Sequence, residues 1–229
     1  MKPNRNVIII TGASGGLGAA VTSAFLDSSA CVAAVARSMS GNPSDTFLPL
    51  SAELSNLEQA RAVVSAVLGK WVRVDALVHL VGGFTGGTPV ADSDDAALEK
   101  MLDLNLRTAY SMMRAVLPVM RAQGSGRIIA IGSRTAVEPA AGLGIYSASK
   151  AALVSLVRTV ALENKDKGIT ANVVLPGTMD TPANRSAMRD ADPNLWIQPS
   201  QIAALLVHLA SGNASQITGA VIPVYGIGA

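Results

Sequence analysis

Short, continuously apolar runs alternate along the chain with longer segments of helical pattern. Runs such as VIII (7–10) and CVAAVA (31–36) are apolar at every position, which is typical of strands covered on both faces of a parallel sheet. The pattern predicts strands at 7–10, 31–36, 74–81, 127–133, 169–175 and 220–224, and helices at 17–28, 57–68, 95–122, 145–165 and 201–210.

Strand–helix alternation from end to end predicts one doubly wound α/β domain over residues 1–229. We expect the helix 95–122 to be broken or adjusted near Pro118. The segment 176–200 has no obvious element, and loops of this length are usually functional or disordered. Because it follows a strand whose carboxyl end faces the ligand edge, we expect a substrate lid at about 178–200.

Composition narrows the class of protein. The chain is 49% hydrophobic and 15% charged, which favours a large core over disorder. A net charge of +2 without a Lys/Arg cluster argues against nucleic acid as a partner. The single cysteine, Cys31, excludes an internal disulfide framework and fits a reducing compartment. With no signal peptide and no run near ~18 apolar residues, we expect a soluble cytoplasmic protein that has no membrane partner and no metal site.

A glycine-rich turn, TGASGGLG, follows the first strand and precedes the first helix. Glycines there permit a tight turn, a close backbone approach to a pyrophosphate and a close helix–strand contact. The helix N-terminus adds free N–H groups and partial positive charge. The turn therefore predicts dinucleotide binding through Gly12, Ser14, Gly16, Leu17 and Gly18. It is not a Walker loop, because no Gly-Lys-Ser/Thr follows.

The end of the second strand indicates which dinucleotide is bound. NAD-binding domains usually carry an acid there for the ribose hydroxyls, whereas this chain has Arg37 and Ser38 after Ala36. A guanidinium can pair with a 2′-phosphate, so NADP(H) is favoured over NAD(H). Alternatively, Arg37 is solvated or stacks on adenine. Glu53, next to Leu54 after the third strand, could accept a hydrogen bond from the adenine amino group.

Tyr146 and Lys150, in GIYSASK, lie four residues apart on one face of a predicted helix. A phenol has a pKa near ~10 and is a poor acid or base at neutral pH. A nearby cation would lower that pKa, and Tyr146 could then exchange a proton with the substrate. Lys150 would also bond the cofactor's ribose. For an isolated Tyr-x-x-x-Lys, the alternative is a snorkelling Tyr beside a surface Lys.

Two further residues favour the catalytic interpretation. Ser133 ends the strand 127–133 at the ligand edge, where its hydroxyl could orient the same substrate oxygen, although such a serine is often a turn former. Asn105 lies within a predicted helix, where Asn is a mediocre choice, so it is expected to bond a backbone carbonyl or hold a water.

In order and spacing, TGASGGLG, Asn105, Ser133 and YSASK resemble the short-chain dehydrogenase/reductase family over nearly the whole chain. The resemblance implies a Rossmann-like, seven-stranded, three-layer α/β/α domain, usually a homotetramer or homodimer. It also implies that Tyr146 is the acid/base, that Ser133 positions the substrate and that Lys150 holds the nicotinamide ribose. Asn105 would hold a water that links Lys150 to a proton relay.

The resemblance extends to the segment PGTMDT after the sixth strand, which makes Pro176, Gly177, Thr178 and Thr181 cofactor candidates. The family commonly has Asn-Asn-Ala-Gly after the fourth strand, whereas this chain has HLVGGFTGG (79–87). Gly82 and Gly83 still allow close cofactor approach. His79 is expected to pack or to bond the backbone rather than to take part in catalysis.

GGFTGG and the segment 180–196 are similar to the quinonoid dihydropteridine reductase branch of the family. Phe84 and Trp196 could flank a flat heterocycle, or they could be packing residues. Two features depart from that branch: it is NADH-linked with an acid after the second strand, and it lacks the catalytic Ser that is present here as Ser133.

These observations favour an NAD(P)(H)-dependent oxidoreductase that acts on a small carbonyl or alcohol. The alternatives are a pterin reductase and a regulator that senses NADP(H) without chemistry. A ketoacyl-carrier-protein reductase is a weaker alternative. It would use Arg107, Arg114 and Arg121, which recur every seven residues, unless these arginines are merely solvated or lie at a subunit interface.

Overall fold

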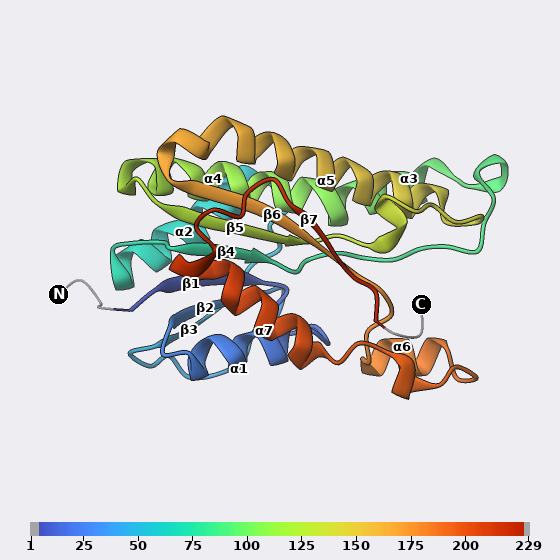
Figure 1. Ribbon diagram of the computed structural model, residues 1–229, viewed down its shortest axis with the longest axis horizontal. Coiled ribbons are helices and arrows are strands. Elements are labelled where there is room, and N and C mark those ends of the chain that lie inside the picture. The colour runs from blue at the N-terminus through green and yellow to red at the C-terminus, as the bar shows by residue number, and fades with distance from the viewer. Residues whose placement is uncertain (1–4, 227–229) are drawn as a thin grey trace.

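The apolar runs form the strands of a single parallel sheet in the computed structural model, which describes residues 5–226. The strand order is β3-β2-β1-β4-β5-β6-β7, and every neighbouring pair is parallel (Figure 1). The strands are β1 (Val7–Thr11), β2 (Cys31–Ala36), β3 (Phe47–Ser51), β4 (Ala76–His79), β5 (Gly126–Ile131), β6 (Ile169–Pro176) and β7 (Val221–Val224).

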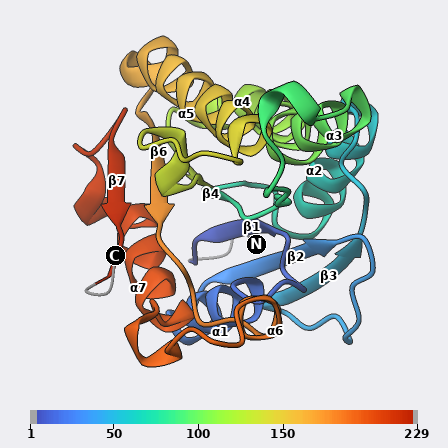
Figure 2. The same cartoon turned by 90° about the vertical axis from the view of Figure 1, so that its right-hand side faces the viewer.

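Helices cover both faces of the sheet and produce the expected three layers (Figures 1 and 2). One face is covered by α2 (Leu57–Trp71), α4 (Thr108–Gln123) and α5 (Gly144–Asn164), and the other by α1 (Gly18–Asp27) and α7 (Pro199–Ala210). The shorter helical segments are α3 (Asp95–Leu102), α6 (Pro182–Ala187), a π-helical turn (Asp103–Arg107) and 3-10 turns at Val90–Asp92, Arg134–Ala136, Lys165–Lys167, Pro193–Leu195 and Gly212–Ala214.

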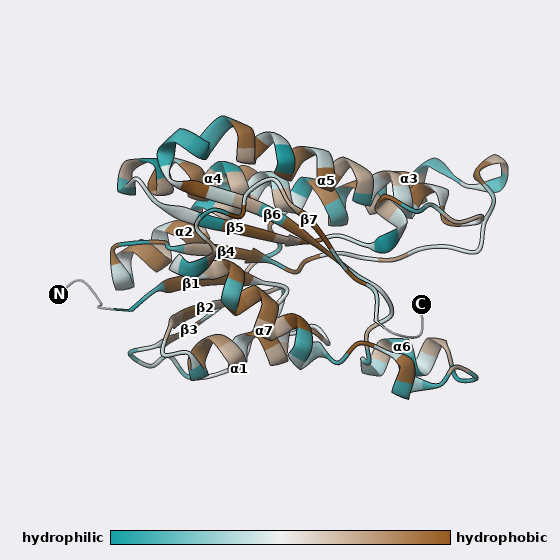
Figure 3. Cartoon of the chain, in the orientation of Figure 1, coloured by the Kyte–Doolittle hydropathy of each residue, from teal (hydrophilic) through white to brown (hydrophobic). Residues whose placement is uncertain are grey.

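Burial on both faces explains why the strands are apolar throughout. In β1, Val7 and Ile9 enter the core under α2 and α4, whereas Ile8 and Ile10 enter the core under α1 and α7. Each fully buried aliphatic side chain contributes about 1.5–3 kcal/mol relative to exposure. The hydropathy colouring shows the same concentration of apolar residues in the strands (Figure 3).

The expected break near Pro118 is wrong. Pro118 lies inside a continuous α4, and the irregularity falls earlier, at the π-helical turn Asp103–Arg107. Pro118 is on the exposed side of α4, where water can hydrate the carbonyl that lacks a proline N–H partner. The segment 176–200 is also more ordered than expected, because it contains α6 and a 3-10 turn.

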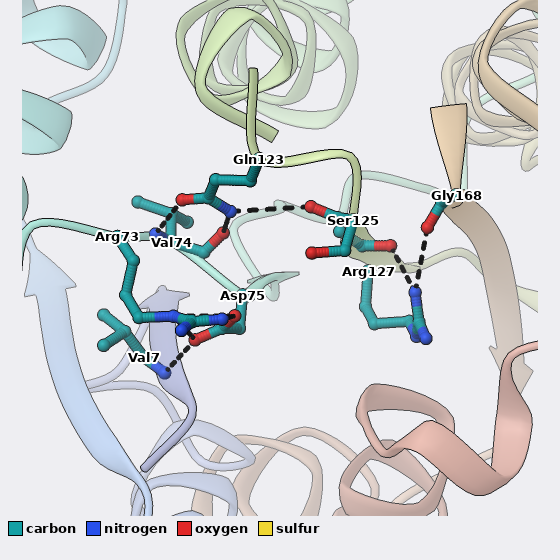
Figure 4. A network of polar contacts seen from close by, with 9 residues as sticks. Val7, Arg73, Val74, Asp75, Gln123, Ser125, Arg127 and Gly168 are labelled. Atoms are coloured by element: carbon teal, nitrogen blue, oxygen red, sulfur yellow. Dashed lines mark hydrogen bonds and ion pairs between the residues drawn. The ribbon is translucent and has the colours of Figure 1, made fainter. Parts of the chain in front are cut away.

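Polar contacts join the strand starts at the sheet edge opposite the ligand edge (Figure 4). The Asp75 carboxylate accepts hydrogen bonds from the Val7 N–H at 2.8 Å and from the Arg73 guanidinium. The Gln123 amide accepts from Val74 N–H at 3.0 Å and donates to Val74 C=O at 2.8 Å. These bonds fix β1, β4 and the end of α4 relative to one another, far from the glycine turn.

The helical segment Gly144–Lys167 contains an 18-residue window that is apolar enough, by length and composition, to cross a membrane. This differs from the expectation that no such segment exists. In the fold it is a core helix, because α5 packs along β6 and buries Leu153 and Val157 completely. The same helix carries Tyr146 and Lys150 to the ligand edge.

Candidate active site

The expected site residues gather at the carboxyl ends of the strands. The glycine turn follows β1, Ser133 follows β5, and the segment 176–200 follows β6. The sheet order places β1 between β2 and β4, so the connections diverge there. Ligands of doubly wound sheets bind in the crevice at this switch point.

Close backbone contacts explain two glycines of the turn. Gly12 has φ +73°, and a Cβ there would lie 3.0 Å from the backbone of Leu80 and Val81. A Cβ at Gly18, the first residue of α1, would collide with the Gly12 carbonyl oxygen. The helix N-terminus therefore packs directly against the turn, and Ser14 and Gly16 are exposed to a ligand. Such a turn fits a pyrophosphate.

The segment after β6 reaches back over this turn. A Cβ at Gly16 would lie 2.9 Å from the Cβ and Cγ2 atoms of Thr181. Thr181 is the N-cap of α6, and its hydroxyl accepts a hydrogen bond from Asn184 N–H at 3.3 Å. The structure thus brings Thr181 next to the phosphate turn, while Pro176, Gly177 and Thr178 line the neighbouring cavity.

The residues expected around the adenosine lie in two separate hollows. Arg37 and Glu53 line one of about 510 Å³ beside β3 and α2. Ser14 and Ser38 line the other, of about 500 Å³, beside α1. Arg37 is exposed and makes no ion pair within residues 5–226. Its guanidinium can therefore reach an anionic ligand. Leu54 is buried, with φ +62°.

Tyr146 and Ser133 line one cavity, and Lys150 lies buried behind them. The Lys150 ammonium donates to the Ile131 carbonyl at 3.0 Å, and burial lowers the pKa of Lys150 to about 8. Burial also raises the pKa of Tyr146, while its interaction with Ser133 has the opposite effect. The expected lowering of the Tyr146 pKa by Lys150 is therefore wrong, because burial has the larger effect and the ammonium points to Ile131.

Asn105 is fully buried in the π-helical turn. Its Oδ1 accepts from Gly83 N–H at 2.8 Å, and its Nδ2 donates to Gly83 C=O at 3.1 Å and to Ser149 Oγ at 2.9 Å. The expected backbone-carbonyl bond is confirmed. A Cβ at Gly82 would lie 2.8 Å from Asn105 Oδ1 and 3.0 Å from Lys150 Nζ, so both side chains converge on Gly82.

His79 is fully buried, and burial lowers its pKa to about 3, so the ring is neutral at physiological pH. Its Nδ1 lies 2.9 Å from Thr11 Oγ1 and its Nε2 lies 3.3 Å from Thr108 Oγ1. Because the Thr108 hydroxyl donates to Leu104 C=O, it accepts from His79 Nε2–H, and Thr11 donates to Nδ1. The expected packing role is confirmed, with bonds to hydroxyls instead of the backbone.

The cavity in front of Tyr146 has a volume of about 890 Å³. Phe84 and Trp196, the two expected substrate residues, both line it. The rings of Phe84 and Tyr146 are 5.0 Å apart at an interplanar angle of 71°, an edge-to-face contact. Phe84 is 68% exposed, so its ring is open to a bound molecule.

Outside the lid, sequence reasoning missed three further cavity residues, Arg134, Thr135 and Tyr225, and one buried partner of Asn105, Ser149. Tyr225 follows β7 directly, so the rule that ligands bind at carboxyl ends of strands was a signal for it. Arg134 follows Ser133, but no spacing distinguishes it from a surface residue. By contrast, each of the three arginines spaced seven residues apart contacts another side chain of the chain. Arg107 pairs with Asp103, Arg114 lies over the Tyr110 ring, and Arg121 donates to Asn164.

Residues 6–192 match the model of a protein family described as short chain dehydrogenase. The chain belongs to this family. The short chain dehydrogenase ausX of Penicillium brasilianum is 30% identical over 246 residues, covering 96% of this chain and 94% of that protein. A 7alpha-hydroxysteroid dehydrogenase of Bacteroides fragilis is 29% identical over 245 residues, covering 96% and 93%.

Solved structures of the family have the same fold. A 3-ketoacyl-(acyl-carrier-protein) reductase from Brucella melitensis, complexed with NADH, has a TM-score of 0.85 and 26% identity, covering 97% of this chain and 98% of that chain. ElxO with NADP bound has a TM-score of 0.91 at 22% identity, covering 98% of each chain. The chain is therefore an NAD(P)-dependent oxidoreductase of the short-chain dehydrogenase/reductase class, with a seven-stranded Rossmann-like fold.

Proposed function

We propose that this protein transfers a hydride between NADP(H) and a small carbonyl or alcohol substrate. The observation that carries the proposal is the shared cavity of Tyr146 and Ser133, with Lys150 and Asn105 buried behind it. The glycine turn fits a bound dinucleotide, because Ser14 and Gly16 are exposed there, while Gly12 and Gly18 allow the close packing that forms the turn. NAD(P)(H) would supply the hydride, and the chain's own residues handle the proton.

In the reducing direction, the Tyr146 hydroxyl donates a proton to the substrate oxygen as that oxygen gains negative charge. Burial favours the protonated phenol, which keeps this proton available at neutral pH. The Ser133 hydroxyl, which accepts from Thr135 N–H at 3.3 Å, is held to donate to the same substrate oxygen.

Lys150 and Asn105 act behind the phenol. A Lys150 pKa of about 8 allows the ammonium to release and regain a proton near neutral pH. We assign Lys150 the nicotinamide ribose as well. Asn105 fixes Gly83 by two hydrogen bonds and so maintains the backbone beside Lys150.

The preference for NADP(H) rests on Arg37, an exposed guanidinium directly after β2 where an acid would favour NAD(H). Ser14 and Ser38, in the separate hollow beside α1, would add hydroxyl donors to a 2′-phosphate. We assign to Glu53, which lines the same hollow as Arg37, a hydrogen bond from the adenine amino group. Pro176, Gly177, Thr178 and Thr181 would contact the cofactor from the other side.

The lid at about 178–200 supplies Trp196 to the cavity, and we propose that it closes over the substrate. Phe84 and Trp196 line the same space, which favours a flat or cyclic substrate between aromatic walls. A pterin ring is the second candidate on this observation. We also propose a homotetramer or homodimer in the cytoplasm; the single, buried Cys31 is compatible with a reducing compartment.

The test is a thermal-shift titration with NADPH and NADH, followed by NADPH oxidation with a panel of cyclic ketones, aldehydes and quinonoid pterins. The proposal expects a larger shift with NADPH and turnover with at least one carbonyl. Tight cofactor binding without turnover of any panel member would instead indicate an NADP(H)-sensing regulator. Turnover of the pterins alone would select the second candidate.

A further inference from the structure

The cavity in front of Tyr146 has a mostly apolar wall that contains two charged side chains among its described lining residues, Arg134 and Asp192. Asp192 is occupied: its Oδ1 accepts from Asn194 N–H and from Asn194 Nδ2, both at 2.9 Å, as the cap of a 3-10 turn. An anionic group on a substrate therefore has one cationic partner among these lining residues, the guanidinium of Arg134.

Two neighbours hold that guanidinium in place. Its Cζ lies 4.9 Å from the centre of the Tyr225 ring, and its Nε donates to Glu138 Oε2 at 2.7 Å. The Nη1 and Nη2 atoms make no hydrogen bond within residues 5–226. The Tyr225 ring thus covers one face of the guanidinium and Glu138 binds its Nε edge, whereas its outer end, formed by Nη1 and Nη2, remains available to a ligand. A fixed, planar fork of this kind matches a carboxylate.

Glu138 binds the Nε edge of the guanidinium and leaves its outer end without a hydrogen bond in the described part of the chain. Its side chain is 50% exposed, so solvent screens its carboxylate, and it is not among the lining residues. Tyr225 and Arg134 both line the cavity, which places their stacked contact at its wall. The Arg134 cation is therefore presented where a ligand would lie.

Arg134 is also tied to the reacting centre. Arg134 directly follows Ser133 in the chain, so the Cα atoms of the two residues are about 3.8 Å apart. The Ser133 hydroxyl is within 3.1 Å of Thr135 Oγ1, so a short polar turn, Ser133–Thr135, carries both the substrate-positioning hydroxyl and the cation. A substrate whose carbonyl oxygen meets Ser133 and Tyr146 can therefore extend a second group to Arg134.

We propose that Arg134 is a specificity-determining residue that binds an acidic group, such as a carboxylate, on a cyclic carbonyl or alcohol substrate. This inference rests on the proposed function and specifies its substrate class. Phe84 and Trp196 cover the ring of the substrate, and the outer end of Arg134 binds its anion. Without the guanidinium, the enzyme would not distinguish a substrate that carries a carboxylate from an uncharged analogue of the same shape.

The experiment compares matched probes that differ in charge but hardly in shape: 4-oxocyclohexanecarboxylate with 4-oxocyclohexanecarboxamide, and 4-formylbenzoate with 4-formylbenzamide. The kcat/KM for NADPH oxidation is measured for each probe with wild type, Arg134→Gln, Arg134→Lys and the surface control Arg61→Gln, which is exposed on α2. Melting temperatures verify that each variant is folded.

In wild type and Arg61→Gln, we expect the acid to exceed its amide by about tenfold or more in kcat/KM for at least one pair. In Arg134→Gln the ratio should fall to about one, mainly through a higher KM of the acid. Arg134→Lys should retain part of the preference. A ratio of about one in wild type would overturn the inference but leave the proposed function intact. A preference for the acid that survives in Arg134→Gln would do the same. No turnover of any carbonyl would overturn both.

Discussion

Gly82 is the point where two candidate catalytic side chains meet, so replacing it by alanine tests the geometry of the site. The added Cβ would lie 2.8 Å from Asn105 Oδ1 and 3.0 Å from Lys150 Nζ. Neither atom can retreat cheaply, since Oδ1 accepts from Gly83 N–H and Nζ donates to Ile131 C=O. Both side chains are buried, and the fold leaves them little free space.

Overpacking of this kind costs about 1–3 kcal/mol. If the whole of that cost is added to the activation free energy, Gly82→Ala lowers kcat about 5- to 150-fold. If it appears as lost stability, the melting temperature falls by about 2–4 °C per kcal/mol for a chain of this size. Either result reports the same contact, and the two assays together show how the cost is divided.

The assay is NADPH oxidation with a carbonyl that wild type reduces, together with thermal unfolding. Gly69→Ala is the matched control, because a Cβ there has no neighbour within 4 Å and Gly69 lies in the exposed part of α2. That substitution should stabilise the protein by about 0.5–1 kcal/mol and leave kcat unchanged. A Gly82→Ala enzyme with wild-type kcat and melting temperature would refute the convergence of Asn105 and Lys150 on Gly82.

Three further variants have separable outcomes. Arg37→Ala should weaken NADPH binding about 10- to 150-fold in a titration, since a charge-assisted hydrogen bond contributes about 1.5–3 kcal/mol, and NADH binding less than about threefold. Equal weakening of both cofactors would exclude contact of Arg37 with the 2′-phosphate. The folded-state pKa of His79 is lowered from 6.5 to about 3, so wild type should lose stability as pH falls through this window. His79→Asn should flatten that part of the stability curve, and an unchanged slope would contradict the buried neutral ring. Asp75→Ala should destabilise the protein by about 1–3 kcal/mol in urea unfolding, because Val7 N–H and Arg73 lose their acceptor. The kcat should not change, since Asp75 lies at the sheet edge opposite the active site, and a large loss of kcat would contradict this.

The strands could be predicted from sequence because burial on both faces leaves an uninterrupted apolar signal. The exception is β3, Phe47–Ser51, for which no bounds could be assigned from its sequence, FLPLS. It is one of the two edge strands, its residues are only half-buried or exposed, and it contains Pro49. An edge position reduces the selection for apolar residues and tolerates proline, so the pattern weakens there.

The members of the candidate site could be chosen from sequence, but their contacts could not. A helical pattern at 95–122 gives no sign of the extra residue in the π-helical turn that carries Asn105. The direction of the Lys150 side chain is set by the Ile131 carbonyl, which no spacing predicts. For the same reason the effect on the Tyr146 pKa was anticipated with the wrong sign. The cavity role of Arg134 depends on its packing against Tyr225, ninety-one residues away in sequence.

The most direct measurement compares wild type with Tyr146→Phe, in NADPH affinity and in turnover of one carbonyl substrate. The phenyl ring keeps the edge-to-face contact with Phe84, so the cavity should persist without the hydroxyl. We predict unchanged NADPH binding and a kcat lower by about 10²–10⁴-fold, the usual contribution of a general acid. A variant that binds NADPH normally and retains near-wild-type kcat would contradict proton transfer by Tyr146, and with it the proposed function of this site.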